Sequence, residues 1–206
     1  MTWNLSPEPL NYPMPKKPRI SKEIKIASFA TLLKESDKGC VLLVGGLFDL
    51  ILEQIFEAAI AGNLANGDPP KNFFQKDLFG NMGPLSTFFG KINLAYAFGL
   101  INREQHEALH VIRDLRNEAA HCYFDFSFRD AGVVNHLKKL KNYDAKINED
   151  RLMQFELVMK KASENMGKFH FVVCCHVILS ELQDKYIAAI EKLIETRAAG
   201  ENVVKR

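Results

Sequence analysis

Apolar residues recur every three or four positions along most of this chain, which is the spacing of a helix with one buried face. Within 37–61 this period is carried by Val41, Val44, Phe48 and Ile51. Strand-like alternation is nearly absent, so the pattern predicts an all-α protein, a compact bundle of about six or seven helices. The predicted helices are 21–35, 37–61, 84–98, one that begins at 102, 130–140, 149–163 and 167–197.

Prolines and glycines set the predicted boundaries of the folded part. Five prolines within 1–20 block a helix, so this segment is predicted to be a poorly ordered, Pro-rich arm. Residues 21–198 are predicted to form a single helical domain, and 199–206 a frayed tail. The loop at 62–83 is rich in turn residues, and its apolar side chains are expected to hold it against the domain. These side chains are Phe73, Phe74, Leu78 and Phe79.

Two pairs of residues are unusual inside the apolar helix predicted at 37–61. Gly45 and Gly46 are each unfavourable in a helix by about 1 kcal/mol relative to Ala, and we interpret them as a point of close contact between helices. A phosphate-binding loop fits less well, because no strand precedes the pair and no Lys-Ser or Lys-Thr follows it. Asp49 and Glu53 lie four residues apart on one face, where like charges repel. They either share a cationic partner or lie on a solvated face.

The composition is that of an ordinary globular protein. The chain of 206 residues is 47% hydrophobic and 25% charged, with a formal net charge of +2. This weak charge gives no general attraction to nucleic acid.

The apolar run at 39–55 contains Asp49 and Glu53, so we do not expect it to span a membrane. Because no export signal is evident, we expect a cytoplasmic protein.

Cysteine and histidine spacing does not indicate a metal site. The apolar neighbours of the cysteines, two of which are adjacent, predict reduced core thiols rather than disulfides. His170 and Cys174 lie at i,i+4, but no second ligand pair at zinc-site spacing accompanies them. His106 and His110 form another such pair, with no third ligand evident in the sequence. We therefore expect no metal and no cofactor. The cysteines are Cys40, Cys122, Cys174 and Cys175.

The segment 84–98 is rich in aromatic residues. Exposed aromatic rings can stack on nucleic-acid bases, but aromatic residues at helical spacing belong more often to a core. We therefore expect these side chains to be buried. They are Phe88, Phe89, Tyr96 and Phe98.

The densest polar cluster beside core-like sequence lies near the end of the helix that begins at 102. It contains Arg113, Arg116, Asn117 and His121. On a straight helix Arg116 and His121 are about 140° apart, so they act together only if the helix ends before His121 or if two copies of the chain combine. We consider three interpretations: a buried network in which Arg116 pairs with Asp37 or Glu35, a ligand or partner site, and an RNA-cleaving site.

Arg116, Asn117 and His121 resemble the signature of the HEPN superfamily, which is an Arg followed after four to six residues by His, with Asn often next to the Arg. HEPN domains are small helical bundles, and several are metal-independent ribonucleases that act as dimers. The resemblance implies that Arg116 would stabilise charge on the reacting phosphate and that His121 would assist proton transfer at the ribose hydroxyl.

A second and more extensive resemblance runs in order along 35–126. Its segments are 35–40 (ESDKGC), 47–49 (LFD), 52–53 (LE), 78–80 (LFG), 83–86 (GPLS), 91–92 (KI), 94–101 (LAYAFGLI), 112–117 (IRDLRN) and 120–121 (AH). Together they resemble the mannitol operon repressor family, whose members are compact, all-helical proteins without a recognisable DNA-binding motif. No helix-turn-helix motif stands out in this chain either.

The second resemblance implies a non-enzymatic, cytoplasmic, bacterial regulator that acts on transcription through another regulatory protein rather than by binding DNA directly; a homodimer is compatible with it. The alternative is a dimeric HEPN-like ribonuclease that cleaves RNA with Arg116 and His121. A third hypothesis is a small-molecule sensor. The candidate binding or structural cluster consists of Glu35, Asp37, Asp49, Glu53, Arg113, Arg116, Asn117 and His121.

Overall fold

The computed structural model describes residues 31–63, 72–123, 125–140 and 165–204. This part of the chain contains helices and turns but no strand, which confirms the all-α prediction. Its elements are α2 (Asp37–Asn63), a short π-helical turn η1 (Phe73–Leu78), α3 (Phe88–Ala97), α4 (Arg103–His121), α5 (Ala131–Lys138) and α7 (Met166–Val204). The predicted arm at 1–20, the predicted helix at 149–163 and most of the one predicted at 21–35 lie outside the described residues.

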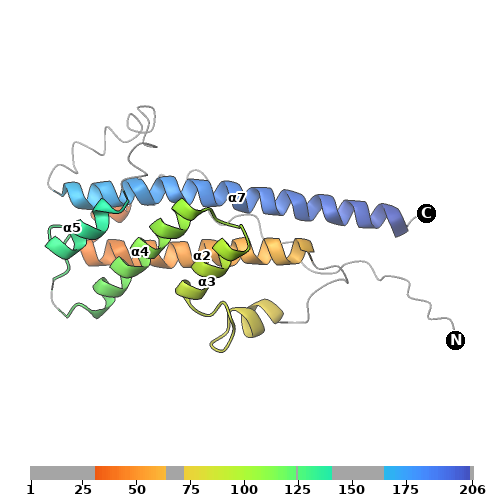
Figure 1. The fold of residues 1–206 in the computed structure, drawn as a ribbon, viewed down its shortest axis with the longest axis horizontal. Coiled ribbons are helices and arrows are strands. Elements are labelled where there is room, and N and C mark those ends of the chain that lie inside the picture. The colour runs from red at the N-terminus through yellow and green to blue at the C-terminus, as the bar shows by residue number, and fades with distance from the viewer. Residues whose placement is uncertain (1–30, 64–71, 124, 141–164, 205–206) are drawn as a thin grey trace, which may run out of the picture.

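The two long helices, α2 and α7, lie side by side and run in the same direction (Figure 1). α4 packs against α2 in the opposite direction. At the start of α2 the Lys38 ammonium donates to the Cys122 carbonyl, just beyond the end of α4, at 2.8 Å. α3 packs against both α2 and α4, and α5 lies near the start of α7. These contacts make one compact bundle.

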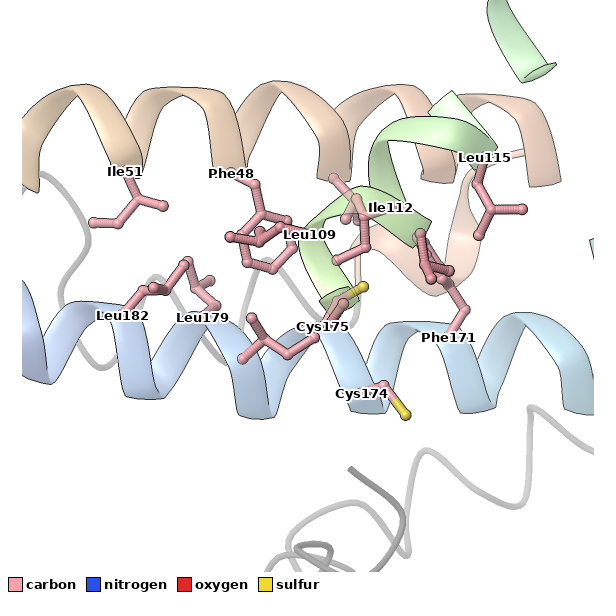
Figure 2. Packing of buried hydrophobic residues seen from close by; sticks show 14 of the residues in the cluster. Phe48, Ile51, Leu109, Ile112, Leu115, Phe171, Cys174, Cys175, Leu179 and Leu182 are labelled. Atoms are coloured by element: carbon pink, nitrogen blue, oxygen red, sulfur yellow. The ribbon is translucent and has the colours of Figure 1, made fainter. Parts of the chain in front are cut away.

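The core lies between α2, α4 and α7, whose apolar side chains interlock (Figure 2). Burial of one such side chain stabilises the fold by about 1.5–3 kcal/mol. Free cysteines, three of them buried, confirm the prediction of reduced core thiols. Burial raises the pKa of the Cys40 thiol to about 12. The labelled core residues are Phe48, Ile51, Leu109, Ile112, Leu115, Phe171, Cys174, Cys175, Leu179 and Leu182.

α2 is long and apolar enough, by length and composition alone, to cross a membrane. Half of the qualifying stretch is buried inside the bundle. Its acidic residues Asp49 and Glu53 both pair with Lys91 of α3. Because the core helix of a folded domain passes the same test, we interpret α2 as the central helix of the bundle.

Side-chain caps mark the starts of α2, α3 and α4. Ser36 caps α2, and Asn102 and Gln105 form a reciprocal capping box at the start of α4. Thr87 caps α3 by accepting a hydrogen bond from a backbone N–H of its first turn. The predicted start of this helix at Pro84 is therefore wrong by about one turn, because the hydroxyl cap lies three residues later.

Two glycines have distinct structural roles. Gly99 has φ of +68°, a left-handed conformation that ends the helix α3 and that side chains rarely adopt. At Gly45 an added Cβ would lie 2.7 Å from Cγ of Arg116, so the close-contact interpretation holds there. At Gly46 nothing lies within 4 Å of an added Cβ, so that interpretation is wrong for the second residue of the pair.

The segment before α3 contains η1, a helical turn that the sequence pattern does not predict. Its Phe74 is buried, and the Phe74 ring stacks on that of Phe79 with centroids 6.3 Å apart. Leu78 and Phe79 pack against the core. The expectation that apolar side chains hold this segment against the domain is therefore confirmed for these three residues.

Candidate functional site

A buried lysine joins α3 to α2. Lys91 is 2% exposed, and its ammonium lies 2.8 Å from Asp49 Oδ1 and 2.5 Å from Glu53 Oε1. The same ammonium lies over the Phe79 ring, 5.7 Å from its centroid. A single cation between the two carboxylates offsets their mutual repulsion and fastens α3 to the central helix. Asp49 and Glu53 were predicted either to share a cationic partner or to lie on a solvated face. The structure shows the first, with Lys91 as the shared cation.

A second polar cluster joins the start of α2 to the start of α7. The Asp37 carboxylate accepts hydrogen bonds from the Phe128 backbone N–H and the Asn165 amide, each at 3.0 Å. It also pairs with the Lys168 ammonium at 3.1 Å, which in turn donates to the Glu35 carbonyl. Burial alone would raise the pKa of the Asp37 carboxyl. The hydrogen bonds and the Lys168 charge together outweigh burial and hold that pKa below its usual value.

The predicted pairing of Arg116 with Asp37 or Glu35 is wrong. Lys168 occupies the place beside Asp37, reaching it from the first turn of α7. Arg116 is exposed on α4, where its Nη1 donates to Asn117 Oδ1 at 3.4 Å. The reason is that apolar residues take the buried face of α4, which leaves this arginine on the outside.

The other members of the predicted cluster are dispersed along α4. Arg113 pairs with Asp114 at 2.6 Å, and His121 is exposed at the last position of the helix. α4 continues without a break to His121, so Arg116 and His121 stay about 140° apart around its axis. A HEPN-like site built from these two residues would therefore need a second copy of the chain.

Exposed aromatic side chains gather on and just after α3. Phe89 is 54% exposed, Tyr96 43% and Phe98 70%. The expectation that they belong to the core is wrong, although it holds for Phe88, which is buried. The buried face of α3 is taken by Phe88 and by three residues at i+3, i+4 and i+7 from it. The next positions around the helix, which include Phe89 and Tyr96, therefore point outward.

Histidines of α4 link these rings into a continuous surface, which we call the aromatic face and define as Phe89, Tyr96, His106, His110 and Arg113. Ring centroids are 4.6 Å apart for Tyr96 and His106, and 4.5 Å apart for the two histidines. The Phe89 ring lies 5.6 Å from that of His110 and 4.9 Å from the guanidinium carbon of Arg113. Such aromatic and cation–π contacts hold the side chains in fixed positions.

The two histidines of the aromatic face are partly buried, and their rings contact each other. Partial burial lowers the pKa of His110, and the neighbouring His106 and Arg113 lower it further, whereas Asp114 acts in the opposite direction. The neutral imidazole of His110 is therefore favoured, and a neutral imidazole has a nitrogen lone pair that can bind a proton or a metal ion. Within the described residues, no group of three or more His, Cys, Asp or Glu side chains is placed to hold a metal ion.

Comparisons with known proteins bear on the fold. No protein-family model matches the chain, and no curated protein matches it. The fold resembles that of MtlR in the X-ray structure of the MtlR-HPr complex from Escherichia coli, with a TM-score of 0.51 and 16% sequence identity. The match covers 77% of this chain and 98% of that chain. At this identity the likeness establishes a shared fold, in agreement with the all-helical bundle that the sequence resemblance implied.

Proposed function

We propose that this protein is a cytoplasmic regulator of the mannitol-repressor type that acts by binding another protein. The observation that supports this function best is the aromatic face, a set of exposed rings on a fold that MtlR, a protein solved in complex with HPr, shares. Aromatic side chains beside an arginine are the residues that most often anchor protein interfaces. A protein partner would cover apolar rings that the bundle itself leaves in solvent.

The charge of the aromatic face favours a protein over nucleic acid as its partner. Partial burial, His106 and Arg113 lower the pKa of His110, which disfavours a positive charge there, and the Arg113 guanidinium is paired with Asp114. Nucleic-acid surfaces need several unpaired Lys or Arg side chains, because neutralisation of phosphates supplies most of the affinity. The aromatic face instead exposes apolar rings and a single cation, Arg113, whose charge is paired with Asp114.

HPr is the first partner to test, by isothermal titration calorimetry with the full-length chain. We expect a saturable complex that Phe89→Ala and Tyr96→Ala each weaken by about tenfold, the usual effect of removing an aromatic anchor from an interface. Tyr123→Ala is the matched control, because Tyr123 is exposed but lies beyond the end of α4. Its affinity should equal that of the wild type.

Two results would contradict the proposal. Equal weakening by Tyr123→Ala would show that the aromatic face is not the interface, and absence of any HPr complex would exclude this partner. The ribonuclease alternative is tested by incubating the protein with single-stranded RNA in a chelator. Cleavage that disappears in both Arg116→Ala and His121→Ala, with folding retained, would replace the regulator by an enzyme.

A further inference from the structure

Three ligand-type atoms converge on the aromatic face. His106 Nε2 lies 3.0 Å from Asn93 Oδ1, and His110 Nε2 lies 3.3 Å from the same oxygen. The two Nε2 atoms are 3.1 Å apart. The histidines come from successive turns of α4 and Asn93 comes from α3, so two helices supply the three corners of one triangle.

Hydrogen bonds account for only part of this triangle. A neutral imidazole carries one N–H, and an amide oxygen carries none. An Nε2–H lies in the plane of its ring and donates to one acceptor. Two neutral rings can therefore make at most two hydrogen bonds among the three close contacts. A single cation between the three atoms would serve them all, because each of the three atoms can offer it a lone pair.

The spacing also fits a metal ion. Donor atoms held about 2.1 Å from one ion lie about 3.0 Å apart at a right angle and about 3.4 Å apart at the tetrahedral angle. The separations of 3.0, 3.1 and 3.3 Å fall within this range. Two imidazole nitrogens with one neutral oxygen suit Zn²⁺, Ni²⁺ or Cu²⁺ better than Mg²⁺ or Ca²⁺, which prefer oxygen ligands.

We propose that His106, His110 and Asn93 form a binding site for a divalent transition-metal ion of this class. The orientation of the amide supports the site. Asn93 Nδ2 donates to the Phe89 carbonyl at 3.0 Å, which turns Oδ1 toward the histidines and holds it there. Both imidazoles are half-buried, so water can fill the remaining coordination positions. This inference does not depend on the proposed function.

The test is calorimetric titration of the full-length, untagged protein with Zn²⁺. We expect one ion per chain, with an affinity that His106→Ala and His110→Ala each lower by about tenfold or more. Both substitutions fall at half-exposed positions of α4 and introduce a good helix former, so folding is expected to survive. His121→Ala, which removes another histidine of the same helix, is the matched control and should bind Zn²⁺ as the wild type does.

Substitution of Asn93 separates a metal site from a set of hydrogen bonds. Asn93→Asp keeps the shape and adds a charged ligand, so it should tighten Zn²⁺ binding by about tenfold, whereas Asn93→Leu should weaken it. The Co²⁺-loaded protein should show no thiolate charge-transfer bands, since the site contains no cysteine. Absence of saturable binding, unchanged binding in both histidine variants, or thiolate bands that indicate the His170–Cys174 pair would overturn the proposal.

Discussion

Replacement of Lys91 by Met tests the buried ion cluster between α2 and α3. Methionine keeps most of the length and apolar volume of the side chain, but it removes the ammonium. Asp49 and Glu53 would then face each other across one turn of α2 with no cation between them. We expect a clear loss of stability, because these carboxylates lie against the core and water reaches only part of each.

The expected loss of unfolding free energy depends on how deeply each charged group is buried. Removing one partner of a fully buried ion pair costs about 3–5 kcal/mol. Here the remaining carboxylates of Asp49 and Glu53 are 37% and 31% exposed, so water solvates each in part. The loss should therefore fall below that range, at about 2 kcal/mol. In a chain of this size this corresponds to a melting temperature lower by about 4–8 °C.

The assay is urea unfolding at pH 7, followed by far-ultraviolet circular dichroism. Arg103→Met is the matched control, because it removes a cation whose pair with Glu107 is exposed on both sides. That variant should unfold at nearly the same urea concentration as the wild type, because exposed ion pairs contribute little to stability. Adding Glu53→Gln to Lys91→Met should restore part of the stability, because the unpaired negative charges fall from two to one.

A loss in Lys91→Met no larger than that in Arg103→Met would refute the reasoning. It would mean that solvent screens the carboxylates well enough for the lysine to be dispensable. The double variant gives an independent check: if Glu53→Gln lowers the stability of Lys91→Met further, repulsion between the carboxylates is not what destabilises the single variant.

Further predictions concern other parts of the fold. Asp37 has a folded-state pKa below its usual value of 3.8, so its contribution is present above about pH 4 and is lost as the pH falls through the folded pKa. Asp37→Asn should therefore lower the urea midpoint of unfolding at pH 7 and have progressively less effect below pH 4, because it removes the charge that pairs with Lys168 and accepts the Phe128 N–H. Gly46→Ala should stabilise the protein by about 0.5–1 kcal/mol in the same assay, whereas Gly45→Ala should gain less or lose stability through contact with Arg116. In the native protein iodoacetamide should modify Cys122 well before Cys40, whose pKa is raised to about 12 by burial, as mass spectrometry of the alkylated chain would show.

The helical framework could be predicted from the sequence because periodicity and capping are local. The helix predicted at 37–61 is α2, and Asn102, the predicted cap, caps α4. Aromatic residues of α3 were harder to place, because a helix of ten residues carries apolar side chains around more than one face. Periodicity identifies Phe88 as buried but does not show that Phe89, its neighbour, is left in solvent.

The polar contacts could be predicted only in part, because most join residues far apart in the chain. No pattern in the neighbouring sequence connects Asp37 to Lys168. The predicted partner, Arg116, is nearer in sequence but does not pair with Asp37. The burial of Lys91 was indicated by the sequence, because Lys91 lies on the apolar face of its helix and a buried lysine needs an acidic partner. Asp49 and Glu53, which lacked a cationic partner in the sequence pattern, could supply it. Asn93 had no comparable signal, because a neutral amide becomes a ligand only through its neighbours in space.

The residues that carry the mannitol-repressor resemblance divide into two groups in the structure. Asp37, Asp49 and Lys91 fasten helices together, so their presence is explained by the stability of the bundle. Tyr96 and Phe98 belong to the same segments but are 43% and 70% exposed, and the exposed part of an aromatic ring adds little to folding and favours aggregation. A structural role accounts for the first group and not for the second. Tyr96 belongs both to the resembling segments and to the aromatic face, which is why experiments on function should begin at that face.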